Sequence, residues 1–153
     1  MLPDNFIKSI KLITSELQNK NIKWALVGTT NLALQGLDVK PNDLDIVTFA
    51  NHIQVFERIF KDYIIKPLTK KISSTKGCPD YYILMLSING VEIEVMGEFE
   101  TNVYFSKVGR GEIEEIDLEG MRIPCLNLSS EANAYEKLGR NKKVEMIKDF
   151  IKP

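Results

Sequence analysis

Two aspartates separated by one apolar residue, Asp43-Leu44-Asp45, open an apolar run that continues to Phe49. Side chains alternate along a β-strand, so the two carboxylates point the same way, with Cα atoms roughly 6.5–7 Å apart. Mg²⁺ prefers oxygen ligands and is shared between a few carboxylates, waters and substrate phosphates. Two such ions can activate an attacking hydroxyl and neutralise a leaving pyrophosphate. By itself the pair is not diagnostic, because exposed strand ends also carry carboxylates.

A glycine turn precedes this pair, between an apolar strand predicted at residues 24–27 and a short helix predicted at residues 29–35. Gly28 lets the backbone approach a ligand, and the amides at a helix start can bind phosphate together with the hydroxyls of Thr29 and Thr30. Such turns are common for packing reasons alone. The turn therefore indicates a phosphate site only in combination with the acids.

A second pair of acids lies on a predicted hairpin, with strands at residues 81–88 and 91–96 around Asn89-Gly90. An Asn-Gly pair between apolar runs is the strongest short hairpin signal. In the second strand Glu92 and Glu94 alternate with aliphatic residues, so both lie on the face away from the helices. Neighbouring strands are about 4.8 Å apart, which would allow one of these glutamates to join the aspartates.

Together these segments resemble the polymerase-β-like nucleotidyltransferase superfamily, in particular its small stand-alone domains in bacteria and archaea. The family pattern is an apolar residue, Gly, and Gly or Ser, then Asp-apolar-Asp/Glu-apolar, and a third acid on a later strand. The matching segments are Val27-Gly28-Thr29, Asp43-Leu44-Asp45-Ile46 and residues 91–95. The resemblance covers residues 22–99, and residues 122–140 are similar to the tail of the same small proteins.

The resemblance implies an α/β (α+β) fold with a mixed, palm-like β-sheet flanked by helices. It implies transfer of a nucleoside monophosphate from a nucleoside triphosphate (NTP) to an acceptor hydroxyl, with release of pyrophosphate. Asp43 and Asp45 would ligate two Mg²⁺ ions, and Glu94 would ligate the one that activates the nucleophile. Gly28, Thr29 and Thr30 would hold the triphosphate.

Two positions stay open within this resemblance. Glu94 is preferred as the third acid because it lies mid-strand between two aliphatic residues, and Glu92 is the alternative. Thr29 stands where the family has Gly or Ser, and Thr30 could supply the hydroxyl instead.

Members of this superfamily modify RNA ends, proteins or small molecules such as antibiotics, and some belong to toxin–antitoxin pairs. The chain shows no large segment for an acceptor, which favours a contribution from a partner protein or a homo-oligomer. The main alternative is a non-catalytic module that binds a nucleotide or a partner. In a third interpretation, the acids are only solvated strand ends.

The composition predicts one ordinary globular domain over residues 1–153, with a core at 22–99 and a C-terminal hairpin and helices at 112–151. The chain has 153 residues, 44% apolar and 27% charged, and a net charge of −1, which argues against a dedicated duplex-binding protein. Cys78 and Cys125 are far apart, so no disulfide framework or structural zinc site is expected. With no run long enough for a membrane span, we expect a cytoplasmic protein.

The remaining segments follow simple patterns, although the pattern is unclear at residues 97–111. We predict a polar loop at residues 66–77, with a short strand before it, from its lysines and serines. The other predicted elements are helices at 4–20 and 51–63, a second hairpin with strands at 112–118 and 121–126, and helices before and after Gly139-Arg140-Asn141.

Overall fold

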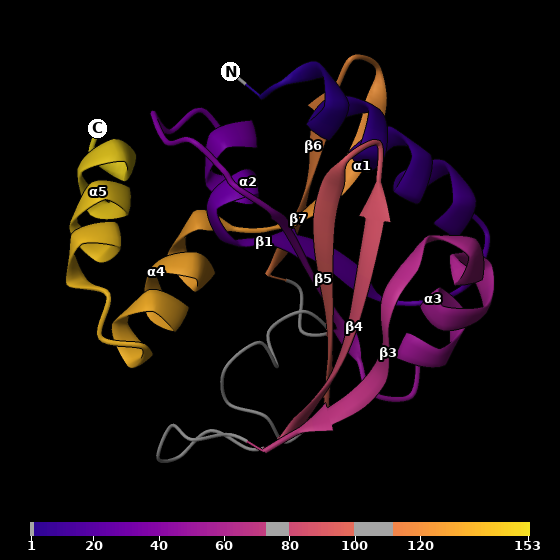
Figure 1. Ribbon diagram of the computed structural model, residues 1–153. Coiled ribbons are helices and arrows are strands. Elements are labelled where there is room, and N and C mark those ends of the chain that lie inside the picture. The colour runs from indigo at the N-terminus through magenta and orange to yellow at the C-terminus, as the bar shows by residue number, and fades with distance from the viewer. Residues whose placement is uncertain (1, 73–79, 100–111) are drawn as a thin grey trace.

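The computed structural model describes residues 2–72, 80–99 and 112–153, and its centre is a seven-stranded sheet in the order β3-β4-β5-β2-β1-β7-β6 (Figure 1). The strands are β1 (Trp24–Val27), β2 (Leu44–Phe49), β3 (Ile64–Lys71), β4 (Tyr81–Ile88), β5 (Val91–Glu98), β6 (Ile113–Leu118) and β7 (Met121–Leu126). Strands β2 and β5, and β1 and β7, are parallel, whereas the other neighbours are antiparallel. The predicted mixed sheet with flanking helices is therefore confirmed.

Five α-helices and a 3₁₀ turn accompany the sheet within the described ranges. They are α1 (Asp4–Leu17), α2 (Gly28–Leu34), α3 (Ile53–Ile59), η1 (Lys61–Tyr63), α4 (Leu128–Lys137) and α5 (Asn141–Ile151). Figure 1 shows α1 and α3 beside the sheet on one side, with α4 and α5 away from them.

The main core lies between the sheet and helices α1 and α3. Helix α1 contributes an apolar stripe at 3.6-residue spacing, and α3 contributes Ile53 and Phe56. These side chains pack on the residues of β2 and β5 that alternate with the acids, such as Leu44 and Ile93. Full burial of each large apolar side chain contributes roughly 1.5–3 kcal/mol, so this face fixes the register of the strands.

Two smaller clusters lie away from that core. Leu32 of α2 and Leu37, three residues after this helix, pack with Tyr135 of α4 and Ile147 of α5. The third cluster lies on the sheet face that carries the acids and contains Ala25, Val27, Val47 and Leu126. The cluster of α2, α4 and α5 holds α4 against the helix that begins at the glycine turn. The third cluster lies beside the acids on the same face of the sheet.

Both predicted hairpins are confirmed, and their turns adopt the required backbone. Asn89 and Gly90 have φ values of 53° and 76°, and Glu119 and Gly120 have 50° and 89°. Two consecutive positive φ values are the mark of a type I′ turn, whose twist matches that of the flanking strands.

The loop predicted at residues 66–77 is wrong over its first part, because β3 continues to Lys71 as an eight-residue strand. This is an edge strand that pairs only with β4, so most of its side chains are exposed and a polar sequence is tolerated. The two register shifts in this pairing, on either side of Lys66, accommodate Pro67, which lacks an amide hydrogen. Residues 73–79 lie outside the described ranges.

Several predicted boundaries also move. The first helix ends at Leu17 rather than residue 20, and Asn19 and Asn21 then adopt positive φ values of 65° and 54°. The helix predicted at 51–63 is α3 followed by the 3₁₀ turn η1. Strand β5 extends through Glu98, while most of the unclear stretch, 100–111, lies outside the described residues.

Cys125 is fully buried in the main core, and burial raises the pKa of its thiol far above the ordinary value. A buried thiol of this kind is inert. Cys78 lies outside the described residues. Among the described helices, none has the length and apolar character that a membrane crossing requires.

Candidate active site

Strands β2 and β5 bring two of the predicted acids next to each other on one face of the sheet. In the parallel register, the Cα atom of Asp45 is paired with that of Glu94, and paired residues point to the same face of the sheet. Glu92 lies one pleat away, is exposed, and is paired with Ser87 of β4. This register supports Glu94, rather than Glu92, as the acid that accompanies Asp45.

Burial and neighbouring charges raise the pKa values of Asp45 and Glu94. Burial raises the pKa of Asp45 to about 7, and the charges of Asp43 and Glu94 add to this increase, while Arg140 opposes it. The pKa of Glu94 is raised by burial and by Asp43, against the effect of Lys71. The charges of Asp43 and Glu94 act on Asp45, and the charge of Asp43 acts on Glu94, so this site favours positively charged ligands.

Asp43 lies one residue before β2 and is exposed, but its backbone is fixed. Its carbonyl oxygen accepts a hydrogen bond of 2.6 Å from Thr30 Oγ1, and Thr30 is 1% exposed. The loop before β2 is therefore tied to the first turn of α2. This bond connects two of the three segments that resemble the family pattern, the glycine turn and the Asp43–Asp45 segment.

Gly28 is the point of closest approach between the turn and the acids. Its φ is +77°, and a Cβ atom added there would lie 2.7 Å from Asp45 Oδ2. A side chain at this position would therefore collide with the carboxylate and strain the backbone. The glycine allows the turn to contact Asp45 directly.

The two threonines after Gly28 have different surroundings. The Thr30 hydroxyl is buried and committed to Asp43, so its role is to hold the loop. Thr29 is partly exposed, and its side chain shares a hydrogen bond with Tyr135, which lowers a tyrosine pKa that burial raises to about 12. Of the two hydroxyls, that of Thr29 is the one placed to meet a ligand.

Helix α4 supplies residues that the sequence reasoning did not assign to the site. Glu131 Oε2 accepts hydrogen bonds of 2.7 Å from the Gly28 amide and from Asn31 Nδ2. Glu131 is 2% exposed, and burial raises its pKa to about 8. The sequence offered no clear signal for this role, because an acid in the first turn of a helix is ordinary.

Positive charges lie around the acids. Arg140, in the turn between α4 and α5, lowers the pKa values of both Asp45 and Tyr135. Lys71, at the end of β3, lowers the pKa of Glu94. A polyanion such as a triphosphate would find cations on two sides of this acidic centre.

The fit of a metal ion can be judged from the donor set. Within residues 2–72, 80–99 and 112–153, no three His, Cys, Asp or Glu side chains are grouped closely enough to hold a metal ion. The candidate donors are nonetheless carboxylates alone, on Asp43, Asp45 and Glu94, and hard divalent cations bind such oxygens. Burial raises the pKa values of Asp45 and Glu94, neighbouring negative charges add to it, and a bound cation would offset both effects. The chemistry of the residues therefore fits a divalent cation.

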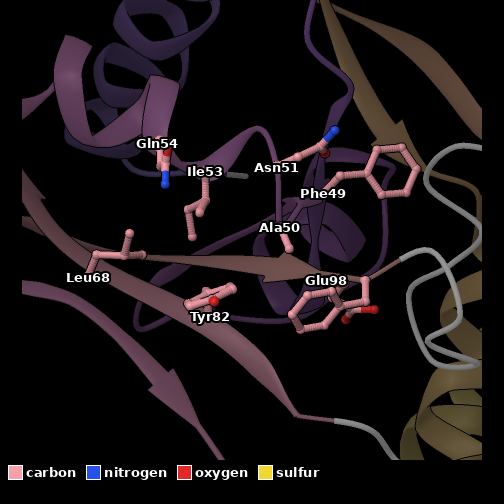
Figure 2. A pocket seen from close by; sticks show the side chains of 9 residues that line it. Phe49, Ala50, Asn51, Ile53, Gln54, Leu68, Tyr82 and Glu98 are labelled. Carbon is pink, nitrogen blue, oxygen red and sulfur yellow. The ribbon is translucent and has the colours of Figure 1, made fainter.

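A separate pocket of about 540 Å³ lies at the other end of β2 and β5. Figure 2 shows Ile53 and Gln54 of α3 on one side of this space and Tyr82 of β4 on the other. Phe49 and Glu98 also line it, and they are paired four residues beyond Asp45 and Glu94 on the same face. None of the predicted site residues lines this pocket.

Comparison with known proteins identifies the family. A model of the family described as aminoglycoside-2''-adenylyltransferase matches residues 9–150. The chain belongs to this family. It is accordingly a member of a nucleotidyltransferase family, and the resemblance found in the sequence is confirmed. No curated protein matches the chain by sequence.

Solved structures share the fold of this family member. A Thermotoga maritima protein, TM1012, described as a candidate nucleotidyltransferase, is 28% identical with a TM-score of 0.77, covering 99% of this chain and 95% of that one. The antibiotic-resistance factor ANT(2'')-Ia is 12% identical with a TM-score of 0.61, covering 94% and 80%. The lincosamide adenylyltransferase LnuA, solved with lincomycin bound, is 12% identical with a TM-score of 0.59, covering 96% and 97%. The last two similarities concern the fold alone.

Proposed function

We propose that the protein transfers a nucleoside monophosphate from an NTP to an acceptor hydroxyl, with release of pyrophosphate. The observation that carries this proposal is the pairing of Asp45 with Glu94, with Asp45 directly against the Gly28 turn. The nucleotidyltransferase family of the chain supplies the reaction class.

The turn after β1 would hold the triphosphate. Gly28 lets phosphate oxygens approach the backbone, and the Thr29 hydroxyl is a partly exposed donor beside it. Arg140, whose charge reaches Asp45 and Tyr135, would bind the phosphates from the side of α4 and α5. Thr30 would act indirectly, because its hydroxyl holds the Asp43 backbone.

Asp43, Asp45 and Glu94 would hold divalent metal, two Mg²⁺ ions in the full arrangement that the resemblance implies, with Glu92 as the alternative third acid. When bound, the metal supplies positive charge that stabilises the leaving pyrophosphate and lowers the pKa of the acceptor hydroxyl. The chain's own contribution is to place these carboxylates on adjacent strands, so that substrate and metal meet at a fixed position.

A small molecule that carries hydroxyl groups is the first acceptor class to test. The family description names an aminoglycoside adenylyltransferase, and LnuA is named for lincosamides. RNA ends and proteins are the other acceptor classes. A partner protein or a second copy of the chain would complete the acceptor site, and we place the reaction in the cytoplasm.

A second candidate function is metal-dependent nucleotide binding without transfer, as in one half of a toxin–antitoxin pair. One observation favours it: Thr29 stands in the triphosphate turn where the family has Gly or Ser. Binding of an NTP without release of pyrophosphate would distinguish this function from the enzyme.

The experiment is a label-transfer assay. The protein is incubated with each of four α-labelled NTPs and Mg²⁺, together with aminoglycosides, lincosamides, total RNA or total protein. We expect label on one acceptor class, and no label with Asp43→Asn. Mg²⁺-dependent binding without transfer to any acceptor would favour the second candidate, and neither binding nor transfer would exclude both.

A further inference from the structure

Glu131 is a buried acid whose hydrogen bonds all lead to the glycine turn. Its Oε2 atom accepts from the Gly28 amide and from Asn31 Nδ2, at 2.7 Å each. Gly28 begins α2 and Asn31 lies in its first turn, while Glu131 lies in the first turn of α4. One carboxylate oxygen thus links the start of α2 to the start of α4 across about a hundred residues of sequence.

The partners of Glu131 are themselves held in place. Asn31 Nδ2 also donates to the Leu126 carbonyl at 2.8 Å, and Gln35 Nε2 donates to Asn31 Oδ1 at 2.7 Å and to the same carbonyl at 3.0 Å. Asn127 Oδ1 accepts from the Ser130 amide and caps α4 just before Glu131. The carboxylate therefore has a fixed position relative to the end of β7.

The same helix face contacts the next residue of the turn. Tyr135, one helical turn after Glu131, shares a hydrogen bond with the Thr29 side chain. Helix α4 thus reaches Gly28 through Glu131 and Thr29 through Tyr135. Asp45 of β2 also lies against Gly28, so two carboxylates, one from β2 and one from α4, contact the start of the turn.

Burial of a carboxylate is costly unless its hydrogen bonds repay the loss of water. An apolar residue would pack in the cluster that α4 forms with α2 at lower cost, because its neighbours there include Leu32 and Ala132. What an apolar residue would not do is accept the Gly28 amide and the Asn31 amide at once. The chemistry of this position therefore serves the geometry of the turn.

We propose that Glu131 is a positioning residue for the triphosphate turn, holding the Gly28 amide so that the Thr29 hydroxyl is presented to the phosphates. This inference rests on the proposed function, because it assigns a residue to the same site. Since Glu131 occupies the Gly28 amide, the phosphate contact of the turn falls to Thr29. The role is indirect, because Glu131 is 2% exposed and is covered by the turn it holds.

The test compares binding of phosphates with binding of a nucleoside. ATP and inorganic tripolyphosphate are titrated calorimetrically with Mg²⁺, and adenosine is titrated by NMR, for wild type, Glu131→Ala, Glu131→Gln and Glu136→Ala. We expect Glu131→Ala to weaken ATP and tripolyphosphate roughly tenfold and to leave adenosine within about twofold, as for loss of one charged hydrogen-bond acceptor. Glu131→Gln keeps an acceptor oxygen and should restore most of the affinity.

Glu136→Ala is the matched control, because this glutamate is exposed on the same helix. If Glu131→Ala binds tripolyphosphate like wild type, the inference is wrong while the proposed function stands. Equal loss of tripolyphosphate and adenosine binding, with a lowered melting temperature, also overturns it. If wild type binds neither ATP nor tripolyphosphate, the proposed function itself fails.

If Glu131→Ala does not fold, Glu131→Asp provides the same comparison, because it shortens the reach of the carboxylate by one methylene. Selective loss of tripolyphosphate affinity supports positioning, and unchanged affinity overturns it.

Discussion

Two carboxylates, buried Glu131 and partly buried Asp45, both lie against Gly28, and they differ in their hydrogen bonds. Glu131 accepts two hydrogen bonds of 2.7 Å, from the Gly28 amide and from Asn31. Asp45, with Oδ2 against the same glycine, accepts no hydrogen bond from the described part of the chain and faces Asp43 and Glu94. Burial raises the pKa of both, to about 8 and about 7.

The difference separates a carboxylate that supports the structure from one that is available to a ligand. The hydrogen bonds from Asn31 and Gly28 oppose the increase that burial causes in the pKa of Glu131, and they fix the turn. The charge of Asp45 is opposed by its neighbours and is relieved only by a proton or by a positively charged ligand. Residues of the second kind contribute to function at a cost in stability.

The largest expected effect concerns the identity of the third acid. Glu94→Gln should lower transfer roughly 100-fold or more, because Glu94 is paired with Asp45 and would ligate the metal. Glu92→Gln is the matched control and should change transfer less than about threefold, since Glu92 is exposed one pleat away. Transfer rates of both variants under saturating Mg²⁺ decide the matter, and the opposite ranking would assign the role to Glu92.

The next effect tests the close approach at the turn. Gly28→Ala should destabilise the fold by roughly 2–4 kcal/mol and abolish transfer, because it combines a strained φ with a collision at Asp45. Gly90→Ala provides the control, with nearly the same φ of +76° and no atom within 4 Å of the added Cβ. It should cost about 1–2 kcal/mol of strain and leave transfer intact. Urea denaturation and the transfer assay measure both, and equal effects of the two variants would contradict the account.

A smaller effect concerns the pH dependence of stability. The pKa of Glu131 rises from 4.5 to about 8 on folding, so the folded state binds the proton more tightly than the unfolded state. Its contribution to stability is present below pH 4.5 and is lost as the pH rises through about 8. Glu131→Gln should therefore remove a decrease of a few kcal/mol between pH 5 and pH 8.5, relative to wild type.

Nearby charged groups also affect how the stability changes with pH. Asp45 raises and Lys143 lowers the pKa of Glu131, and both remain in the variant. The difference between wild type and Glu131→Gln in denaturation series without metal thus isolates Glu131. Identical slopes for the two proteins would show that its pKa is not raised by folding.

The smallest effect concerns the bond between the two segments of the site. Thr30→Val keeps the shape of the side chain and removes the hydroxyl that donates to the Asp43 carbonyl. We expect a loss of about 1 kcal/mol in stability and a few-fold loss in transfer, as Asp43 shifts. Thr30→Ser keeps the donor and should retain transfer, so a loss in both variants would point to packing rather than to the hydrogen bond.

Local signals predicted part of this molecule well. The Asn-Gly turn at 89–90 and the alternation of acids with aliphatic residues depend only on neighbours in sequence, and both strands appear where expected. Most of strand β3 was predicted as a loop, because an edge strand with exposed lysines lacks the apolar pattern that marks a buried strand. Pairing with β4 stabilises strand β3, and this pairing leaves no pattern in the sequence of β3.

The acids of the candidate site could be named from the sequence, whereas the pairing of their strands and the position of Glu131 could not. Spacing marks Asp43 and Asp45, but the register that pairs Asp45 with Glu94 is a contact between distant segments and follows only from the folded sheet. Glu131 follows the cap of α4 and reads as an ordinary acid of a helix start, which is usually exposed. Only the packing of α4 against α2 shows that it is buried beside Gly28.

The most direct test of the account is Asp45→Asn, measured for both transfer and stability. The account predicts that transfer falls below detection while the free energy of unfolding at pH 8 stays equal or rises, because the change relieves repulsion with Asp43 and Glu94. Transfer that persists at the wild-type rate would contradict the central claim that Asp45 belongs to the active site.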